Sequence, residues 1–335
     1  IISNVVLGED EVFDPSSAAI SFKKCGDFYG FMSRGSVIRI YDATGQRQFL
    51  FDKKALDNHY LFPNGLPVAF DYDAQANLLY VLFGGSKTLF AVNTQGQIIK
   101  SIALELPKNL SAAMAPHLEV SFEEKAIYLT TGDMNADVID HSFFKNSPLI
   151  SRFTMKGEFI NNIGAYPKAY HQSGKFSNGH PFRFYRYLRE KDRHYFLFDI
   201  SAEVHEYNSQ GELLTVHAVP SNIRNYRFEP SGISYFSDQR IAQPTNDIHY
   251  FMAKRHDKAL FYIGHQLLRE EHGKKDTYLL RADPKAQVIT EINLTETFGI
   301  AFHARLGSIM PSDTLDFFLA SPFSDQVRVV KAIIE

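Results

Sequence analysis

A six-residue turn recurs along the chain, and its spacing constrains the fold more than any other feature of the sequence. Each copy places a polar residue at the end of an apolar run and a glycine three residues later. The clear copies are residues 41–46 (YDATGQ), 92–97 (VNTQGQ), 153–158 (FTMKGE) and 207–212 (YNSQGE), and residues 282–287 (ADPKAQ) are a copy that has lost its glycine. Glycine tolerates the positive φ angle of tight hairpin turns, so each copy predicts a β-hairpin.

The spacing of these turns predicts the architecture. The turn glycines and their equivalent stand at positions 45, 96, 157, 211 and 286, which are 51, 61, 54 and 75 residues apart. Residues 77–104 show what one period contains, because three apolar runs (78–83, 88–92 and 97–102) are joined by the turn Gly84-Gly85-Ser86 and by one copy of the recurring turn. Periods of about fifty residues with several short strands each are typical of β-propeller blades.

A second marker leads into the first strand of each predicted blade. Its copies are residues 64–70, 178–184, 231–235 and 298–302, with weaker copies at 17–22 and 115–120. Six copies predict an all-β, six-bladed β-propeller in which residues 1–335 form a single domain. Residues 220–247 leave a seven-bladed alternative open, because the segments 232–235 and 248–253 could each begin an inner strand.

The two ends of the chain are predicted to share one blade. Residues 1–8 form an apolar strand without a neighbour in sequence, and residues 315–320 and 326–334 supply two strands near the other end. Pairing the N-terminal strand beside the C-terminal strands would complete the last blade and protect two open edges. The other blades are expected at about 17–51, 67–104, 117–164, 180–219 and 259–294, and residues 265–275 are either a short helix or a long hairpin tip within the last of these.

Composition supports a large core and gives no sign of a polyanionic partner. The chain is 44% hydrophobic with 29 Phe, 17 Tyr and no Trp, and its net charge of −3 gives no bulk attraction to nucleic acid or to an anionic membrane. No apolar run approaches the roughly 18 residues needed to span a bilayer. The single cysteine, Cys25, is expected to have a packing role.

Candidate site residues follow from the predicted geometry, because the connections that enter the inner strands converge at one mouth of a propeller channel. The residues expected there are Asn64, His117, Glu119, Asn178, His180, Arg183 and His303, and the long loop ahead of the fifth blade adds Arg224 and Arg227 as a lid. Such a set suits an oxyanion or carboxylate ligand, or a metal ion with mixed nitrogen and oxygen ligands. The alternative is that these side chains satisfy backbone groups or line a water-filled channel.

Two other motifs have structural interpretations. Residues 133–140 (DMNADVID) match the opening of a calcium-binding loop, but Val138 replaces its glycine and Phe144 its final glutamate, which favours an exposed polar loop. Residues 183–193 (RFYRYLREKDR) interleave arginine with aromatic residues, but the alternation of a strand splits them between two faces. No nucleophile elbow, zinc-binding helix motif, P-loop or dinucleotide fingerprint is present in the sequence.

The recurring turn, the aromatic-rich inner strands and the length together resemble the TolB-like and NHL-like six-bladed propellers, in particular uncharacterised extracytoplasmic bacterial members. The resemblance covers essentially the whole chain and is carried by repeats of the fold. It implies a periplasmic, cell-surface or secreted module that binds a small molecule, peptide or protein, with a removed leader or a lipid anchor preceding Ile1. No cofactor and no resident metal are expected.

The same resemblance leaves an enzymatic alternative. Related six-bladed lactonases and lyases bind a divalent cation on the propeller axis through Glu, Asn, Asp or His, and Glu119, Asn64 and Asn178 stand at plausible places. The primary hypothesis is therefore a ligand- or protein-binding propeller, and the alternative is a metal-dependent lactonase-like hydrolase or lyase.

Overall fold

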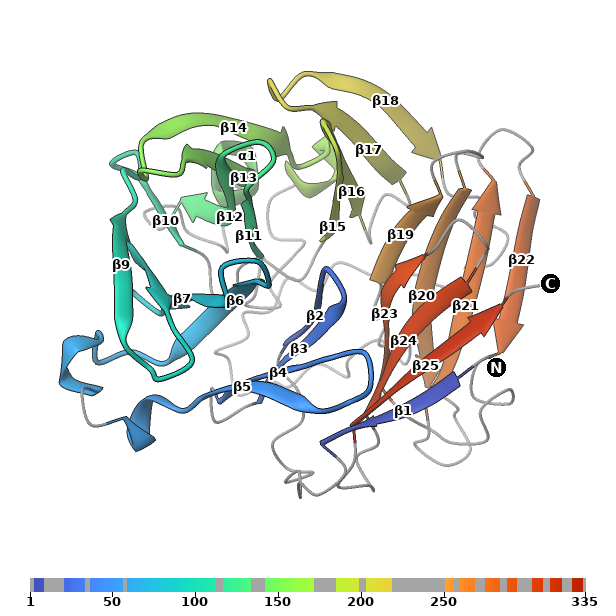
Figure 1. The fold of residues 1–335 in the computed structure, drawn as a ribbon. Helices are drawn as coiled ribbons and strands as arrows, with labels where there is room; N and C mark the ends of the chain where they lie inside the picture. The colour runs from blue at the N-terminus through green and yellow to red at the C-terminus, as the bar shows by residue number, and fades with distance from the viewer. Residues whose placement is uncertain are drawn as a thin grey trace, which may run out of the picture. The chain divides into compact units, whose positions relative to one another are not determined.

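The computed structural model describes most of the chain, and all but a few short helical turns of its regular structure is β-strand (Figure 1). The described residues are 3–8, 21–33, 37–56, 59–112, 117–133, 142–171, 185–198, 203–218, 251–255, 260–268, 275–283, 288–293, 303–309, 314–320 and 327–333. The helical elements among them are α1 (Ser142–Asn146) and the 3-10 turns η2 (Lys53–Ala55), η3 (His59–Leu61) and η4 (Lys168–His171).

The described strands form antiparallel sheets in which most strands pair with their neighbours in sequence; β10 and β11 both pair with β12, and β1 pairs with β25. The first sheet contains β2 (Ser21–Cys25), β3 (Phe28–Met32), β4 (Ile38–Tyr41) and β5 (Arg47–Phe51), and the second contains β6 (Pro67–Asp73), β7 (Leu78–Phe83), β8 (Thr88–Val92) and β9 (Ile98–Ala103). The third contains β10 (Leu110–Ala112), β11 (Leu118–Ser121), β12 (Ala126–Asp133), β13 (Pro148–Thr154) and β14 (Phe159–Ala165). The fourth contains β15 (Tyr185–Glu190), β16 (Arg193–Phe198), β17 (Glu203–Asn208) and β18 (Leu213–Ala218), and the fifth contains β19 (Phe251–Arg255), β20 (Leu260–Leu268), β21 (Lys275–Asp283) and β22 (Val288–Asn293).

The remaining sheet joins the two ends of the chain, as the sequence predicts. Its order is β1 (Ser3–Leu7), β25 (Val327–Ile333), β24 (Thr314–Ala320) and β23 (His303–Ile309). Figure 1 shows β1 beside β25, and their antiparallel register runs from the pair Ser3 and Lys331 to the pair Leu7 and Val327. The N-terminal strand therefore completes the C-terminal sheet.

The recurring turn connects the third and fourth strands of a sheet, and one side-chain oxygen organises each copy. In the first copy Asp42 Oδ1 accepts hydrogen bonds from the backbone N–H groups of Thr44 (2.8 Å) and Gln46 (3.1 Å). Asn93, Thr154 and Asn208 accept the equivalent pairs of bonds in the other clear copies. The turn glycines have φ angles of 74° to 91°, so the hairpins form as predicted.

Two of these glycines also join neighbouring sheets, which the sequence does not reveal. Gly45 O accepts a hydrogen bond of 2.9 Å from Gly8 N, and Gly157 O accepts one of 2.8 Å from Glu105 N. A Cβ atom added to Gly157 would overlap the carbonyl oxygen of Ala103, at the end of β9. Glycine is therefore required at position 157 for the close approach of two sheets as well as for the turn.

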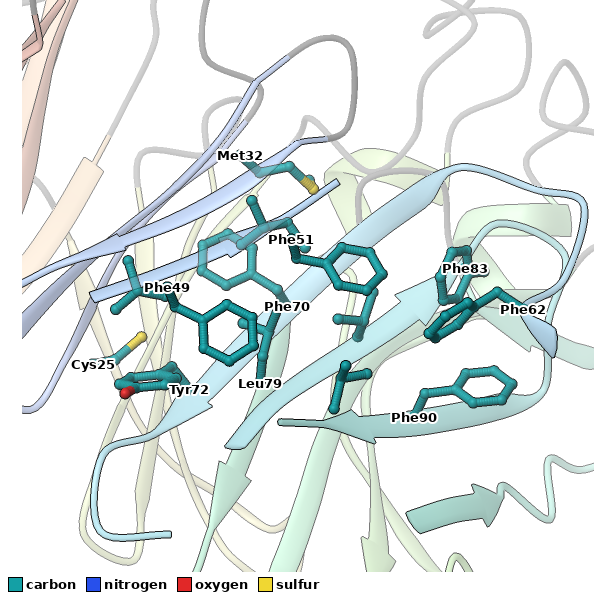
Figure 2. Close-up of a cluster of buried hydrophobic side chains, with 14 residues drawn as sticks. Cys25, Met32, Phe49, Phe51, Phe62, Phe70, Tyr72, Leu79, Phe83 and Phe90 are labelled. Atoms are coloured by element: carbon teal, nitrogen blue, oxygen red, sulfur yellow. The ribbon is translucent and has the colours of Figure 1, made fainter. Parts of the chain in front are cut away.

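The core between the first two sheets consists largely of aromatic side chains (Figure 2). Phe62, from the loop that precedes β6, packs edge-on against Phe51 and Phe90 with ring centroids 5.5 Å and 5.7 Å apart, and it also contacts Phe83. Edge-to-face packing is the favoured arrangement of aromatic pairs. The excess of phenylalanine in the sequence thus fills the space between consecutive sheets.

The chain divides into two compact units, residues 1–131 with 151–161 and 303–335, and residues 132–150 with 162–302. In the first unit β2 lies against both β6 and β23, and β6 lies against β11. In the second unit β15 lies against β19. These are the first strands of consecutive sheets, and their contact is what a propeller-like arrangement requires.

Several boundaries differ from the sequence-based expectations. The third sheet has the additional strand β10. Strands β20 and β21 pair as far as Leu268 and Lys275, so residues 265–268 are strand, whereas residues 269–274 between the two strands lie outside the described residues. Asp133 ends β12, whereas residues 134–140 of the calcium-like motif lie outside the described residues. The segment 220–247 also lies outside them, together with the marker copies at 178–184, 231–235 and 298–302.

Candidate ligand-binding site

A buried ion pair links the first strands of two neighbouring sheets. Lys23 on β2 and Asp71 on β6 lie with Nζ and Oδ1 2.8 Å apart, and their side chains are only 19% and 10% exposed. Asp71 Oδ1 also accepts the backbone N–H of Tyr72 (2.9 Å), and the Cys25 thiol lies 3.6 Å from it. The carboxylate is thus surrounded by donors within an otherwise apolar strand.

The same ion pair holds the backbone of β11 on both sides of Glu119. Lys23 Nζ donates to the carbonyl oxygen of Leu118 (2.6 Å), and Asp71 Oδ2 accepts from the backbone N–H of Val120 (2.7 Å). The other edge of β11 pairs with β12, where Glu119 stands opposite Tyr128. Lys23 and Asp71 therefore take the place that a neighbouring strand would have, and they fix the backbone from which the Glu119 side chain projects.

His117 and Glu119 form a partly exposed pair beside this clamp. His117 Nε2 lies 3.5 Å from Glu119 Oε2, and the two side chains are 32% and 22% exposed. Thr130 fixes the backbone of His117 twice, because its hydroxyl accepts the His117 N–H (2.9 Å) and its own N–H donates to the His117 carbonyl (3.0 Å). Glu119 is thus held on β11, and the backbone of His117 is held at the residue that precedes this strand.

Burial and neighbouring charges set the protonation states in the cluster. Burial lowers the pKa of His117 below its ordinary value, with the Lys23 charge acting in the same direction and Glu119 opposing it. The imidazole is therefore neutral at pH 7 and offers one donor and one acceptor nitrogen. Burial by itself would lower the pKa of Lys23, but Asp71, with smaller contributions from Cys25 and Glu119, more than compensates, so the net shift is upward and the ammonium stays charged.

Cys25 has the packing role that the sequence predicts. Its side chain is buried, and burial together with the adjacent Asp71 carboxylate raises the pKa of the thiol far above its ordinary value. The thiol is therefore protonated at neutral pH and is a poor nucleophile.

Two of the predicted site residues come together, and the remainder do not enter the described cluster. His117 and Glu119 form the pair described above, and Asn64 lies exposed in the loop that leads into β6. His303 is the first residue of β23, and its side chain lies outside the described part of the chain. The other predicted positions, Asn178, His180, Arg183, Arg224 and Arg227, lie outside the described residues and stay predictions.

Lys23 and Asp71 were not predicted from the sequence. The sequence does give an indication at Asp71, because a carboxylate between Phe70 and Tyr72 in an inner strand needs a charged or hydrogen-bonding partner when it is buried. Nothing in the local sequence identifies that partner as Lys23, 48 positions earlier, because the contact depends on how two sheets meet.

The cluster suits hydrogen bonding better than metal coordination. Among the described residues, no group of three or more His, Cys, Asp or Glu side chains is arranged to bind a metal ion. A cation beside Glu119 would also meet the charged Lys23 ammonium, which repels it. Within the described part of the chain, no helix has the length and apolar character to cross a membrane.

The strands and their first-strand contacts define the class of protein as all-β with a propeller-like arrangement. Comparison with solved structures agrees. A member of the DUF4221 family from Bacteroides vulgatus superposes with a TM-score of 0.62 at 12% identity, covering 99% of this chain and 97% of the other. A protein from Bacteroides fragilis whose description proposes export superposes with a TM-score of 0.56 at 9% identity, covering 99% and 95%.

A streptogramin B lyase is also similar, but its TM-score of 0.47 at 10% identity, over 98% of each chain, supports no argument about activity. No protein-family model matches the chain, and no curated protein matches it either. At these levels of identity, the structural likenesses show the fold alone.

Proposed function

We propose that this protein is an extracytoplasmic binding module, a six-bladed β-propeller of the TolB-like or NHL-like kind that holds a polar small molecule or peptide at the ends of its inner strands. The observation that carries the proposal is the preorganised pair His117 and Glu119, which combines partial exposure with a backbone fixed by Lys23 and Asp71. Groups that are held in place before binding lose little conformational entropy when a ligand arrives.

The chemistry of the pair favours binding over catalysis. The partly exposed side chains of Glu119 and neutral His117 carry hydrogen-bonding atoms, of which His117 Nε2 is itself buried, while Lys23 is already engaged by Asp71 and by the Leu118 carbonyl. The thiol nearest to the cluster is protonated and buried. A lactonase-like hydrolase or lyase needs an axial cation, which the neighbouring ammonium charge disfavours. The binding hypothesis is therefore preferred, and the enzymatic alternative has no specific observation in its favour.

The location outside the cytoplasm is inferred from two sources. The sequence resembles extracytoplasmic propellers, and the similar Bacteroides fragilis protein is described in terms of export. Expression of the complete gene followed by fractionation of periplasm, membrane and cytoplasm tests this location, and recovery in the cytoplasmic fraction alone would contradict it.

A thermal-shift screen tests the binding function. Organic acids, amines, oligosaccharides, short peptides and divalent metals are added to the wild type and to the variants His117→Asn and Glu119→Gln. A true ligand present at a hundred times its Kd stabilises the folded state by about 2.7 kcal/mol, which is readily detected. We expect a hit that raises the Tm of the wild type and of neither variant. A metal that stabilises the wild type and confers lactone hydrolysis would instead support the enzymatic alternative.

A further inference from the structure

An exposed apolar surface lies on the loop between the first and second sheets, outside the His117 and Glu119 pair. Tyr60, Leu61 and Leu66 are 74%, 53% and 54% exposed, which places them among the most exposed large hydrophobic side chains of the described residues. All three lie within seven positions of the sequence. Single exposed apolar residues are ordinary, but a cluster on one loop indicates an interaction surface.

The loop is anchored firmly underneath this surface. Phe62 stands between Leu61 and Pro63 and is buried at 4% exposure among Phe51, Phe83 and Phe90. The ammonium of Lys53 donates to the carbonyl oxygens of Pro63 and Gly65. The apolar side chains are thus displayed on a backbone with little freedom to lose upon binding, and such side chains make efficient binding anchors.

The turn between β7 and β8 holds the far end of the loop. Gly84 N donates a 2.9 Å hydrogen bond to Leu66 O, and a Cβ atom at Gly65 would come within 2.5 Å of the Gly84 carbonyl oxygen. Two sheets therefore fix the position of Leu66, and the turn that contacts it continues into Lys87.

Two exposed basic residues, Lys54 and Lys87, border this surface among the described residues. Lys54 lies on η2, which packs against η3 with Tyr60 and Leu61, and Lys87 follows the turn that binds Leu66. Both lysines are exposed, whereas the nearby Asp52 is half-buried and its carboxylate caps the Lys54 backbone N–H at 3.0 Å. The described charged residues of this loop and turn are Lys53, Lys54, Lys87 and Asp52, which is a positive balance in a chain whose net charge is −3.

We propose that Tyr60, Leu61 and Leu66, with Lys54 and Lys87 at the rim, form a docking surface for an acidic protein segment that carries aromatic or aliphatic side chains between its carboxylates. The apolar residues supply the anchors, and the two lysines select the charge of the partner. The proposal rests on the proposed binding function of the module and adds the class of a protein partner, at a surface separate from the polar pair.

Selection from a displayed library of random 12-residue peptides tests this assignment with the full chain. Peptides are selected on the wild type, sequenced and synthesised with a fluorophore, and their affinity is measured by fluorescence anisotropy. We expect enriched peptides to combine Asp or Glu with Phe, Tyr or Leu. We further expect the double variant Tyr60→Ser/Leu61→Ser to weaken binding at least tenfold, and Lys54→Glu/Lys87→Glu to weaken it most at low salt.

Matched variants distinguish this surface from the rest of the molecule. Ile99→Ser removes an apolar side chain of similar exposure (55%) on β9 and should leave affinity unchanged. Four results would each overturn the proposal. The Tyr60→Ser/Leu61→Ser variant could bind the peptides as tightly as the wild type, the enriched peptides could lack acidic residues, or no peptide could be enriched. The fourth result is a concentration-dependent dimer of the wild type that this double variant abolishes. Loss of peptide binding upon His117→Asn would show instead that the polar site is the peptide site.

Discussion

At the scale of single residues, the buried ion pair of Lys23 and Asp71 requires that both partners are present. Removal of one partner leaves the other charge buried, which typically costs about 3–5 kcal/mol of unfolding free energy. We therefore expect Lys23→Met and Asp71→Asn each to lower stability by about 3 kcal/mol or more in urea denaturation. The double variant should lose less unfolding free energy than the sum of the losses in the two single variants. The exposed Lys100 is the control, because Lys100→Met removes an ammonium that reaches only the Met155 carbonyl, at 3.3 Å. Additive losses in the double variant would contradict the pairing.

The upward shift in the pKa of Lys23 gives a pH dependence with a definite sign. In the unfolded chain this lysine has its ordinary pKa of 10.5, and in the folded protein the pKa is higher. The stabilisation from its charge is therefore complete below pH 10.5 and is lost as pH rises through the folded-state pKa. We expect the stability difference between the wild type and Lys23→Met to shrink as pH rises above this value. A difference that stays constant from about pH 8 to about pH 12 would contradict the assignment.

A comparison of Gly157 with Gly85 distinguishes two reasons for glycine in a turn, which are a positive φ angle and a lack of space for a Cβ atom. Both have positive φ angles, of 91° and 75°, but only at Gly157 would an added Cβ meet another sheet, whereas at Gly85 no heavy atom lies within 4 Å. Gly85→Ala should cost about 1–2 kcal/mol from backbone strain alone. Gly157→Ala should cost about 1–3 kcal/mol more because of the overlap with Ala103. Equal losses in unfolding free energy for the two variants would mean that the close contact of Gly157 with Ala103 does not contribute to stability.

At the scale of elements, the N-terminal strand is a separable part of the last sheet. Leu7 is fully buried against Tyr29, Phe31, Tyr41 and Val329, so β1 contributes core contacts as well as hydrogen bonds to β25. A chain that begins at residue 9 should have a lower Tm, and a synthetic peptide of residues 1–8 added in excess should restore part of the loss. A scrambled peptide is the control, and unchanged stability after truncation would contradict the role of β1.

The strands were predictable from sequence where a turn marks them clearly. The runs at 78–83 and 88–92 coincide with β7 and β8, and the pairing of the two chain ends follows from an apolar strand that has no local partner. The local sequence pattern does not predict those features that depend on contacts between sheets. The clamp of Lys23 and Asp71 on β11 joins residues from three sheets, and the second function of Gly157 depends on the position of Ala103.

At the scale of the whole molecule, only part of the predicted site lies in the described residues, and the set as a whole stays a prediction. His117 and Glu119 are two positions apart, at the residue before β11 and within it, so the alternation of an extended backbone places them on the same side. Asn178 and Arg224 could be grouped with them only by assuming how distant loops meet, and their positions stay predictions. The apolar surface of Tyr60 and Leu61 was also not foreseen, because exposure depends on the anchoring of Phe62 beneath it.

The central proposal is that consecutive antiparallel sheets form six blades around one axis, with β1 completing the last. An experimental structure of the full chain, determined by crystallography, tests it most directly. We predict six blades around a single axis, with β1 paired to β25 and the Lys23 and Asp71 pair bound to the backbone of β11. Two stacked layers of strands without a central axis, or a seventh blade built from residues 219–250, would contradict it.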